Sequence, residues 1–396
     1  MTLRVLCLDI EGGFGGSSRS LYESIRHLDR DRVSPEVWCG REGPIQARYA
    51  ALGVACRTVS WPRYSALPRF SRNLLALGRA ELELIRSGAL LADLAATVEQ
   101  RFDVVHLNHE SLFLVAAWLR RRTKKALVSH LRTLVVPSSF ARWQARTIGR
   151  ASNRAVFITE NEQDFWTARG LDHCPTDIVY NIVEAPRDDI GPHPSIPVDS
   201  RFKVACVSNY AWLRGVDRLV DIATALRDRG RSDILFVVAG DMRLKGSLSG
   251  ALGRIAARGG SLADYAEARG VRAMFVFPGH VGDPERVLVA GHMVARPSRN
   301  NDPWGRETLE ALAAGKPVIS TGTYDRFVED GVTGRLFAEY ETAAFASAIE
   351  RFADDRALCA RLGAAGRRRV ETLCNGPART EDLLGVWTMA KAIRSD

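Results

Sequence analysis

Two carboxylates lie eight positions apart in the stretch 296–320, Asp302 in a polar loop and Glu310 inside a short segment rich in Leu and Ala. Start and stop signals predict that this segment is a helix that begins near Gly305 and ends before Gly315. The free N–H groups of a helix N-terminus attract anions, and a glycine there lets a phosphate approach the backbone. A carboxylate can accept hydrogen bonds from two sugar hydroxyls. The arrangement therefore suits a ligand with phosphate and hydroxyl groups, such as a nucleotide sugar.

The same stretch resembles the signature of the retaining glycosyltransferases of family 4, which have the GT-B fold. That signature is Pro-Ser, an acid, seven residues, a Glu, and then Ala-x-Ala-x-Gly-x-Pro-Val. Asp302 takes the first acidic position, where the family usually has Glu, and Glu310 takes the second. The resemblance implies that Asp302 contacts the transferred sugar, that Glu310 contacts the ribose, and that Gly305 and Arg306 bind the donor. The alternative is an ordinary strand and helix with a capping Asp and a surface Glu.

A glycine-rich loop follows the first predicted strand, 3–9, and precedes a predicted helix. Four glycines at this point allow the backbone to come close to a ligand. The loop resembles the Gly-Gly loop of family 4, which implies that Gly15 and Gly16 border the donor sugar and diphosphate. A tight packing turn is the alternative. The loop lacks the GxGxxG pattern of dinucleotide-binding proteins, which argues against an NAD-dependent dehydrogenase.

A third candidate loop joins a strand that ends at Ser208 to a helix that starts at Val216. Family 4 usually has an Arg in this loop and a Lys five positions later, and both contact the diphosphate. Here these positions are Asn209 and Arg214. Arginine can bind a phosphate through two parallel hydrogen bonds, so the resemblance assigns Arg214 to the diphosphate. Asn209 removes one charge, which leaves open a protein that binds a nucleotide sugar without catalysis.

Two predicted strands, 102–108 and 126–132, end in histidines at the edge of the sheet where open α/β folds bind ligands. The resemblance places His130 near the reacting centre, where it would orient the sugar or the acceptor. His109 is a second candidate. For each histidine, the alternative is a ring whose hydrogen bonds are satisfied within its own loop.

The 396 residues suggest roughly two domains. We expect an α/β protein of the GT-B fold, with two Rossmann-like domains that face each other across a cleft. The predicted parts are an acceptor-side domain at 1–185, a Pro-rich linker at 186–200, a nucleotide-sugar-binding domain at 201–376, and a helix at 377–396 that packs back on the first domain.

The net charge of +9 suits an anionic ligand or an anionic membrane surface, although a basic surface without a role is the alternative. No basic and aromatic nucleic-acid module appears, so we expect no nucleic-acid partner. Two stretches that mix aromatic residues with arginines, 61–72 and 137–154, are candidate membrane contacts. No apolar run approaches the roughly 20 residues of a membrane span, so we expect a cytoplasmic protein, peripheral on the inner face of the cell membrane.

We expect transfer of a sugar from a UDP- or GDP-linked donor to a glycan or lipid-linked acceptor, in surface polysaccharide or lipopolysaccharide synthesis. The seven cysteines lack metal-ligand spacing, and the Asp-x-Asp triplet at 29–31 lies outside the candidate donor-binding loops, so we expect no metal and no cofactor. A nucleotide-sugar 2-epimerase of the same fold, which needs no acceptor, is a further alternative.

Overall fold

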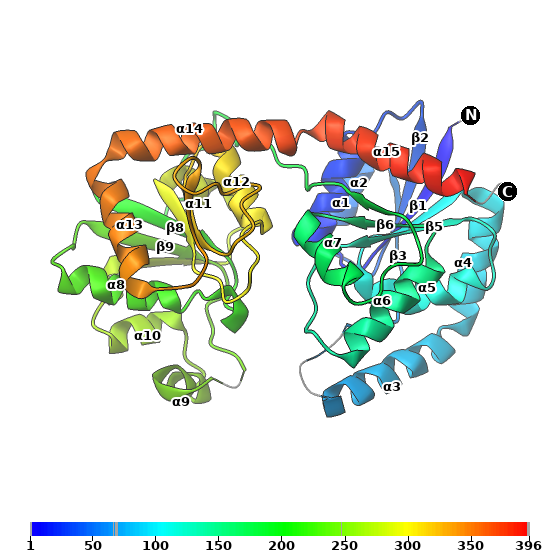
Figure 1. Cartoon of the computed structure of the whole chain (residues 1–396), viewed down its shortest axis with the longest axis horizontal. Coiled ribbons are helices and arrows are strands. Elements are labelled where there is room, and N and C mark those ends of the chain that lie inside the picture. The colour runs from blue at the N-terminus through cyan, green and yellow to red at the C-terminus, as the bar shows by residue number, and fades with distance from the viewer. Residues whose placement is uncertain (1, 66, 68–69, 247, 394–396) are drawn as a thin grey trace. The chain divides into compact units, whose positions relative to one another are not determined.

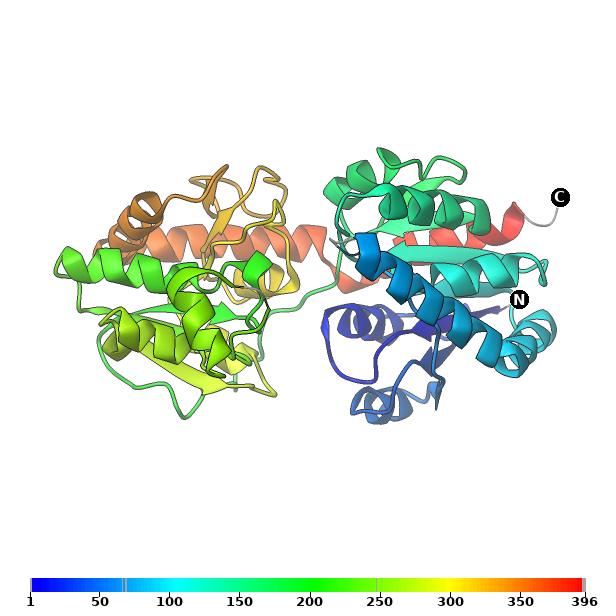
Figure 2. The ribbon, with the colours of Figure 1, turned by 90° about the horizontal axis from the view of Figure 1, so that it is seen from below.

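The computed structural model describes residues 2–65, 67, 70–246 and 248–393 (Figure 1). The chain divides into two compact units. The first combines Met1–Ile182 with Gly376–Asp396, and the second is Val183–Asn375. Each unit is a parallel sheet with helices on both faces, as the views in Figures 1 and 2 show.

The sheet of the first unit has the strand order β3-β2-β1-β4-β5-β6-β7. Its strands are β1 (Leu3–Asp9), β2 (Val33–Cys39), β3 (Ala55–Thr58), β4 (Val104–Leu107), β5 (Ala126–Leu131), β6 (Arg154–Phe157) and β7 (Thr176–Ile178). Its helices are α1 (Gly16–Arg26), α2 (Ile45–Ala51), α3 (Phe70–Arg86), α4 (Gly88–Arg101), η1 (Glu110–Leu112), α5 (Phe113–Arg120), α6 (Ser139–Ala151), α7 (Glu160–Thr167) and α15 (Gly376–Ala392).

The sheet of the second unit has the order β10-β9-β8-β11-β12-β13. Its strands are β8 (Phe202–Val207), β9 (Ile234–Ala239), β10 (Phe275–Gly279), β11 (Met293–Arg296), β12 (Val318–Thr321) and β13 (Gly334–Phe337). Its helices are η2 (Trp212–Arg214), α8 (Arg218–Asp228), α9 (Gly250–Ala257), α10 (Leu262–Ala268), η3 (Arg272–Met274), α11 (Glu285–Ala290), α12 (Arg306–Ala313), α13 (Thr342–Asp354) and α14 (Arg356–Leu373).

Both sheets form because their central strands are continuous apolar runs. Strands β4, β5 and β9 are buried at every position, as expected for parallel strands covered by helices on both faces. In each sheet the strand order reverses beside the first strand, between β1 and β4 and between β8 and β11. The loops at the carboxyl ends of these strands therefore diverge and leave room for a ligand.

Helix α15 completes the core of the first unit, although it lies nearly 200 residues after the rest of that unit. Its Leu383 and Trp387 are buried in the same apolar cluster as Val5 of β1 and Leu21 of α1. The indole Nε1 of Trp387 also donates a hydrogen bond to Nδ1 of His106, at 3.1 Å. The predicted fold class is confirmed: two Rossmann-like α/β domains, with a C-terminal helix that returns to the first.

The stretch 61–72, a candidate membrane contact, is described only in part, because residues 66, 68 and 69 lie outside the described residues. Trp61 and Tyr64 are buried, at 3% and 2% exposure. The Trp61 ring stacks on Trp38, and the Tyr64 ring packs against Phe113. These two aromatic side chains belong to the core and do not face solvent.

Candidate functional site

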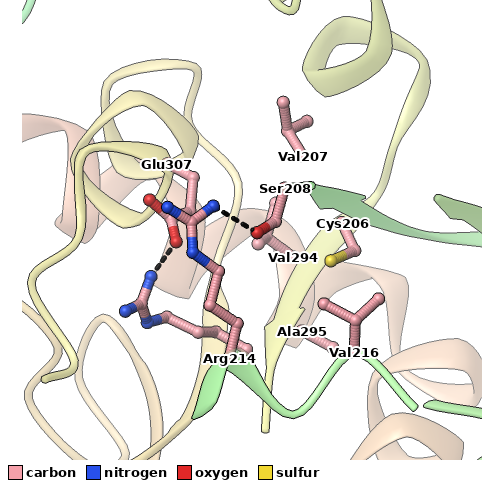
Figure 3. Close-up of a pocket in the computed structure, with 9 residues that line it drawn as sticks. Cys206, Val207, Ser208, Arg214, Val216, Val294, Ala295 and Glu307 are labelled. Carbon is pink, nitrogen blue, oxygen red and sulfur yellow. Dashed lines mark hydrogen bonds and ion pairs between the residues drawn. The ribbon is translucent and has the colours of Figure 1, made fainter. Parts of the chain in front are cut away.

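The candidate site of the second unit lies where the strand order reverses, at the carboxyl ends of β8 and β11. A small pocket there is shown in Figure 3. Its walls come from the ends of both strands, from the loop after β8, and from the first turn of α12. The lining residues are Cys206, Val207, Ser208, Arg214, Val216, Val294, Ala295, Arg296 and Glu307.

Arg296, the last residue of β11, organises the polar part of this site. Arg296 is only 7% exposed, and its guanidinium forms ion pairs with two carboxylates, those of Asp302 and Glu307. The distance from its Nη2 to Oδ2 of Asp302 is 2.6 Å. Oδ1 of Asp302 accepts a hydrogen bond from Oγ of Ser298, at 2.7 Å. A buried cation is stable only when it is paired, so Arg296 and Ser298 together fix the orientation of Asp302.

Gly305, at the N-terminus of α12, lies directly against the ion pair of Arg296 and Glu307. A Cβ atom at this position would overlap the guanidinium of Arg296 and would lie 2.8 Å from Oε2 of Glu307. Any other residue would therefore displace the ion pair beneath the helix. The prediction that Gly305 also admits a phosphate stays a prediction.

Glu310 lies one turn further along α12, on its buried face. Its Oε1 lies 2.8 Å from Nε of Arg306, an ion pair between residues four apart in the helix. The two side chains are 10% and 12% exposed. The predicted donor-binding residues Arg306 and Glu310 thus contact each other, and each is fixed by the other.

The loop after β8 contributes Arg214 to the same pocket. Nη1 of Arg214 donates a hydrogen bond to Oγ of Ser208, at 2.7 Å, so the guanidinium points back toward the end of β8 (Figure 3). Asn209 has a different role, because its Oδ1 accepts a hydrogen bond from the backbone N–H of Asp241, at 2.8 Å, and so ties the β8 loop to the β9 loop. The structure therefore brings Arg214 into the pocket and uses the Asn209 amide oxygen in the scaffold.

In the first unit, Gly15 and Gly16 form the start of α1, and Gly15 is the residue before the helix. Among the described residues, apart from chain neighbours and the helix's own backbone, no heavy atom lies within 4 Å of a Cβ placed at either glycine. A Cβ at Gly12, by contrast, would overlap the backbone of Arg41. Close packing explains why a glycine occupies position 12, but it does not explain the glycines at positions 15 and 16. The N-cap residue Gly15 has no side chain with which to cap the helix, so the N–H groups of this N-terminus and the open space beside them suit an anionic ligand.

A buried polar network, which the sequence analysis did not identify, connects the ends of β1, β4 and β5. Arg132 is its centre: Nη2 and Nε donate to Oδ1 of Asn108 at 2.6 and 3.1 Å, and Nη1 donates to Oδ1 of Asn181 at 3.1 Å. Nδ2 of Asn108 donates to Oδ1 of Asp9, at 3.1 Å, and to the backbone oxygen of Ser17 in α1. Burial raises the pKa of Asp9, while the hydrogen bond from Asn108 opposes the rise. The network fixes the start of α1 relative to the sheet.

His130, in β5, is only 1% exposed and lies against the ring of His106 in β4, with 5.3 Å between the ring centroids. Neither of its ring nitrogens has a hydrogen-bond partner within the described residues. Burial lowers the pKa of His130 well below 6.5, and Arg132 and His106 lower it further. Burial also lowers the pKa of His106, to about 3. Both rings are therefore neutral near pH 7. His109, the second candidate, contacts Ser111 and Glu110 of its own loop.

These two rings should make stability depend on pH. In the unfolded chain a histidine has a pKa near 6.5, so below that pH the unfolded state binds protons that the folded state excludes. We expect the free energy of unfolding to fall as pH drops from about 6.5 toward 3, by up to about 1.4 kcal/mol per pH unit for each ring. Urea unfolding of the protein and of His106→Gln/His130→Gln between pH 7.5 and 5 measures the difference in slope. Equal slopes of unfolding free energy against pH in the two proteins would contradict this explanation. The raised pKa of Asp9 has the opposite effect on the slope, but it is present in both proteins and cancels in the comparison.

Among the described residues, no group of three or more His, Cys, Asp or Glu side chains is arranged to hold a metal ion. Within the same residues, no helix combines the length and the apolar character that crossing a membrane requires.

Comparison with protein families matches two models to successive parts of this chain. Residues 14–187 match Glycosyltransferase Family 4, and residues 193–369 match Glycosyl transferases group 1. An α-D-kanosaminyltransferase of Streptomyces kanamyceticus is 27% identical over 258 residues. That match spans 61% of this chain and 62% of the relative, so the chain covers less than two thirds of that relative's length.

Solved structures share the fold of this chain over nearly its whole length. The structure of Anabaena Alr3699/HepE in complex with UDP and glucose has a TM-score of 0.77 and 18% identity, with 98% of this chain and 99% of that chain covered. The lipopolysaccharide outer core galactosyltransferase WaaB, in its apo form, has a TM-score of 0.65 and 14% identity, with 97% and 98% covered. At such identities the likeness shows the fold. The two family models, together with the signature at Asp302 and Glu310, show that this chain belongs to the family 4 (group 1) glycosyltransferases, and the structural likeness shows that it has the GT-B fold.

Proposed function

We propose that the protein transfers a sugar from a nucleotide diphosphate sugar to an acceptor, with retention at the anomeric carbon and without a metal ion. One observation carries the proposal: the cation Arg214, the N-terminus of α12 and the oriented carboxylate of Asp302 lie around the carboxyl ends of β8 and β11. A cation and a helix N-terminus can bind a diphosphate. Carboxylates can accept hydrogen bonds from the hydroxyls of a ribose and of a sugar.

The residues of the second unit have separate roles in this proposal. Arg214 and the N–H groups at Gly305 bind the diphosphate, and Glu310, fixed by Arg306, accepts hydrogen bonds from the ribose hydroxyls. Asp302 binds hydroxyls of the transferred sugar. Both of its oxygens already have protein partners, but a carboxylate has about four lone-pair sites, so it can accept further hydrogen bonds.

Residues of the first unit also have proposed roles. Gly15 and Gly16, at the start of α1, leave room for the donor sugar and diphosphate. His130, which the resemblance places near the reacting centre, would orient the sugar or the acceptor. The residue is 1% exposed, so a direct hydrogen bond to either requires the ring to become accessible when the ligands bind.

Fixed charges and dipoles supply the stabilisation that the departing diphosphate needs. Negative charge develops on the leaving group as the bond to the anomeric carbon breaks. The Arg214 guanidinium and the N–H groups of α12 are held in place before reaction, so no reorganisation is needed when the charge appears. This chemistry does not require a divalent ion, and transfer in the presence of EDTA tests that part of the proposal.

Product analysis tests the reaction type. The protein is incubated with UDP-linked and GDP-linked sugars, and NMR follows both the nucleotide and the anomeric proton. Release of nucleoside diphosphate, with an α-linked donor giving an α-linked product, supports retaining transfer. A change at C2 of a donor that stays intact would mean an epimerase. Binding without turnover would mean a non-catalytic protein.

A substitution of Arg214 tests the diphosphate site. We expect Arg214→Ala to weaken UDP or GDP binding by about 10- to 100-fold, because a charge-assisted phosphate contact contributes roughly 1.5–3 kcal/mol. Isothermal titration with the nucleoside diphosphate and with the nucleoside alone separates the phosphate from the base. Arg254→Ala, on exposed α9, is the matched control. Equal losses for the diphosphate and the nucleoside would place Arg214 elsewhere.

The donor and acceptor classes are also proposals. HepE, whose structure was solved with UDP and glucose, supports a UDP-linked donor, and GDP remains the alternative. WaaB, a lipopolysaccharide outer core galactosyltransferase, supports a glycan or lipid-linked acceptor in surface polysaccharide or lipopolysaccharide synthesis. Such acceptors are assembled at the inner face of the cell membrane, so we place the protein in the cytoplasm, peripheral on that membrane.

A further inference from the structure

Helix α3 presents large apolar side chains to solvent along one face. Leu74, Leu75, Leu82 and Ile85 are 53%, 67%, 45% and 76% exposed. At about 100° per residue these four positions fall within an arc of roughly 100°, which is the width of a packed helix face. Single exposed apolar residues are common on proteins, but four on one helix face form a patch.

The opposite face of α3 packs against the rest of the first unit. The helix is therefore held in place, and its exposed apolar face is not the result of a helix without contacts. Asn73 is 1% exposed: its Oδ1 accepts hydrogen bonds from the hydroxyl of Tyr64, at 2.7 Å, and from the backbone N–H of Leu67, at 2.8 Å. Ala80 is buried in the apolar cluster that also contains Ala145 of α6. The inner face thus anchors α3 on the first unit, and Figure 2 shows the helix on the outside of that unit.

Arginines follow one margin of the exposed face at intervals of seven residues. Arg72, Arg79 and Arg86 are all exposed, and none forms an ion pair with a carboxylate in the part of the chain that the structure describes. Seven residues are nearly two helical turns, so these side chains stand in a row beside the apolar patch. Glu81 lies at the other margin, away from that row, whereas the exposed Glu83 lies beside the row without forming an ion pair among the described residues.

The neighbouring helix α6 adds to the same chemistry. Its Trp143 is 39% exposed, and its Arg142 and Arg146 are exposed as well. Helices α3 and α6 contribute to one apolar cluster, so they are neighbours on the first unit. The stretch 137–154, which the sequence suggested as a membrane contact, therefore lies beside a stronger apolar patch that the sequence analysis did not identify.

We infer that the outward face of α3 is a docking surface for an anionic lipid membrane. Leu74, Leu75, Leu82 and Ile85 would enter the boundary between headgroups and acyl chains, while the row of arginines binds phosphate groups of the lipids. This inference rests on the proposed function of a transferase at a membrane and names the surface that makes the contact. Donor hydrolysis measured without vesicles tests the transferase proposal separately.

A second copy of the chain fits this face less well. Two copies related by a two-fold axis would bring their rows of unpaired arginines into one interface, where like charges repel. A single helix face is also small against the roughly 800 Å² per partner of a stable interface. Lipid phosphates, in contrast, are negatively charged and would give the three arginines the ion-pair partners that the described residues do not provide.

Vesicle flotation tests the inference with the full-length protein. The vesicles are made of phosphatidylcholine alone or with about a third of phosphatidylglycerol. We expect the protein to bind only the anionic vesicles. Added salt should weaken this binding, because at 0.1 M it screens charges over a Debye length of about 10 Å. Arg72→Gln/Arg79→Gln/Arg86→Gln should bind about 100-fold more weakly, since each arginine near an anionic bilayer contributes about fivefold. Leu75→Glu/Ile85→Glu should lose at least about 30-fold.

Matched variants separate this surface from general charge. Arg254→Gln/Arg258→Gln/Arg361→Gln removes the same charge from exposed sites on the second unit and should bind as the unchanged protein does. Val198→Glu, at a side chain 98% exposed, controls for the added acid. Because the substituted side chains are exposed, all variants should fold, which circular dichroism checks. Equal loss in the control triple, equal binding to neutral vesicles, or no vesicle binding would overturn the inference. So would a dimer in light scattering that Leu75→Glu/Ile85→Glu dissociates.

Discussion

Replacing Glu310 with alanine should lower kcat/KM for the donor by about 100-fold or more. In the proposed site this carboxylate accepts hydrogen bonds from two ribose hydroxyls, and each hydrogen bond to a charged group contributes roughly 1.5–3 kcal/mol. Glu310 is 8% exposed and is held by Arg306, so its position is set before the donor binds. Because the ribose does not react, most of the loss should appear in KM.

The measurement is the rate of donor hydrolysis or transfer as a function of donor concentration. Glu310→Gln keeps the shape and one acceptor oxygen and should lose less. Glu267→Ala, on the exposed face of α10, is a control for the loss of one carboxylate from the second unit. A Glu310→Ala protein that melts normally and keeps its donor KM would show that Glu310 does not bind the ribose.

Replacing Arg296 with methionine should affect both stability and activity. The change leaves Asp302 and Glu307 without their cation, and removing one partner from a buried ion pair typically costs 3–5 kcal/mol. The two carboxylates are 25% and 19% exposed, so water lowers this cost, and we expect about 3 kcal/mol from urea unfolding. Activity should fall as well, because Asp302 loses the partner that fixes its orientation.

A second variant separates the two effects of Arg296. Arg296→Met/Asp302→Asn/Glu307→Gln removes the cation and both charges together, so it should recover most of the lost stability. It should not recover activity, since the sugar-binding carboxylate is gone. If Arg296→Met alone keeps full activity, or if the triple variant regains activity, Asp302 is not the sugar-binding acid that Arg296 positions.

The fold could be predicted because its evidence is local and repeated. Apolar runs such as Leu3–Asp9 and Ile234–Ala239 are fully or almost fully buried strands, and glycines and prolines mark the loops between them. The spacing of Asp302 and Glu310 around a helix start is also local. These features depend on residues close together in the chain, so the sequence contains them directly.

The contacts that complete the site join residues far apart in the chain, so the sequence does not reveal them. Arg296 belongs to β11 and Glu307 to α12, and only the fold brings the guanidinium beneath the helix. Arg132 contacts Asn108 and Asn181, which are 24 and 49 positions away. Nothing in the spacing of these residues predicts the network.

His130 and Asn209 show a second limit, the direction of a side chain. The sequence places His130 near the end of a strand, but strand alternation decides which face its ring occupies, and in the structure the ring is buried beside His106. Asn209 stands at the position where the family usually has a cation, and its amide oxygen binds the backbone of Asp241, which belongs to another loop.

The most direct test of the account is a thermal-shift measurement with UDP, GDP and ADP and their common sugar conjugates, in the presence of EDTA. A ligand that binds only the folded state raises Tm with its concentration. We predict that one nucleoside diphosphate raises Tm, that the rise shrinks in Arg214→Ala and in Glu310→Ala, and that Arg254→Ala behaves as the unchanged protein. A rise of the same size in all four proteins, or no rise with any nucleotide, would contradict a donor site at the ends of β8 and β11.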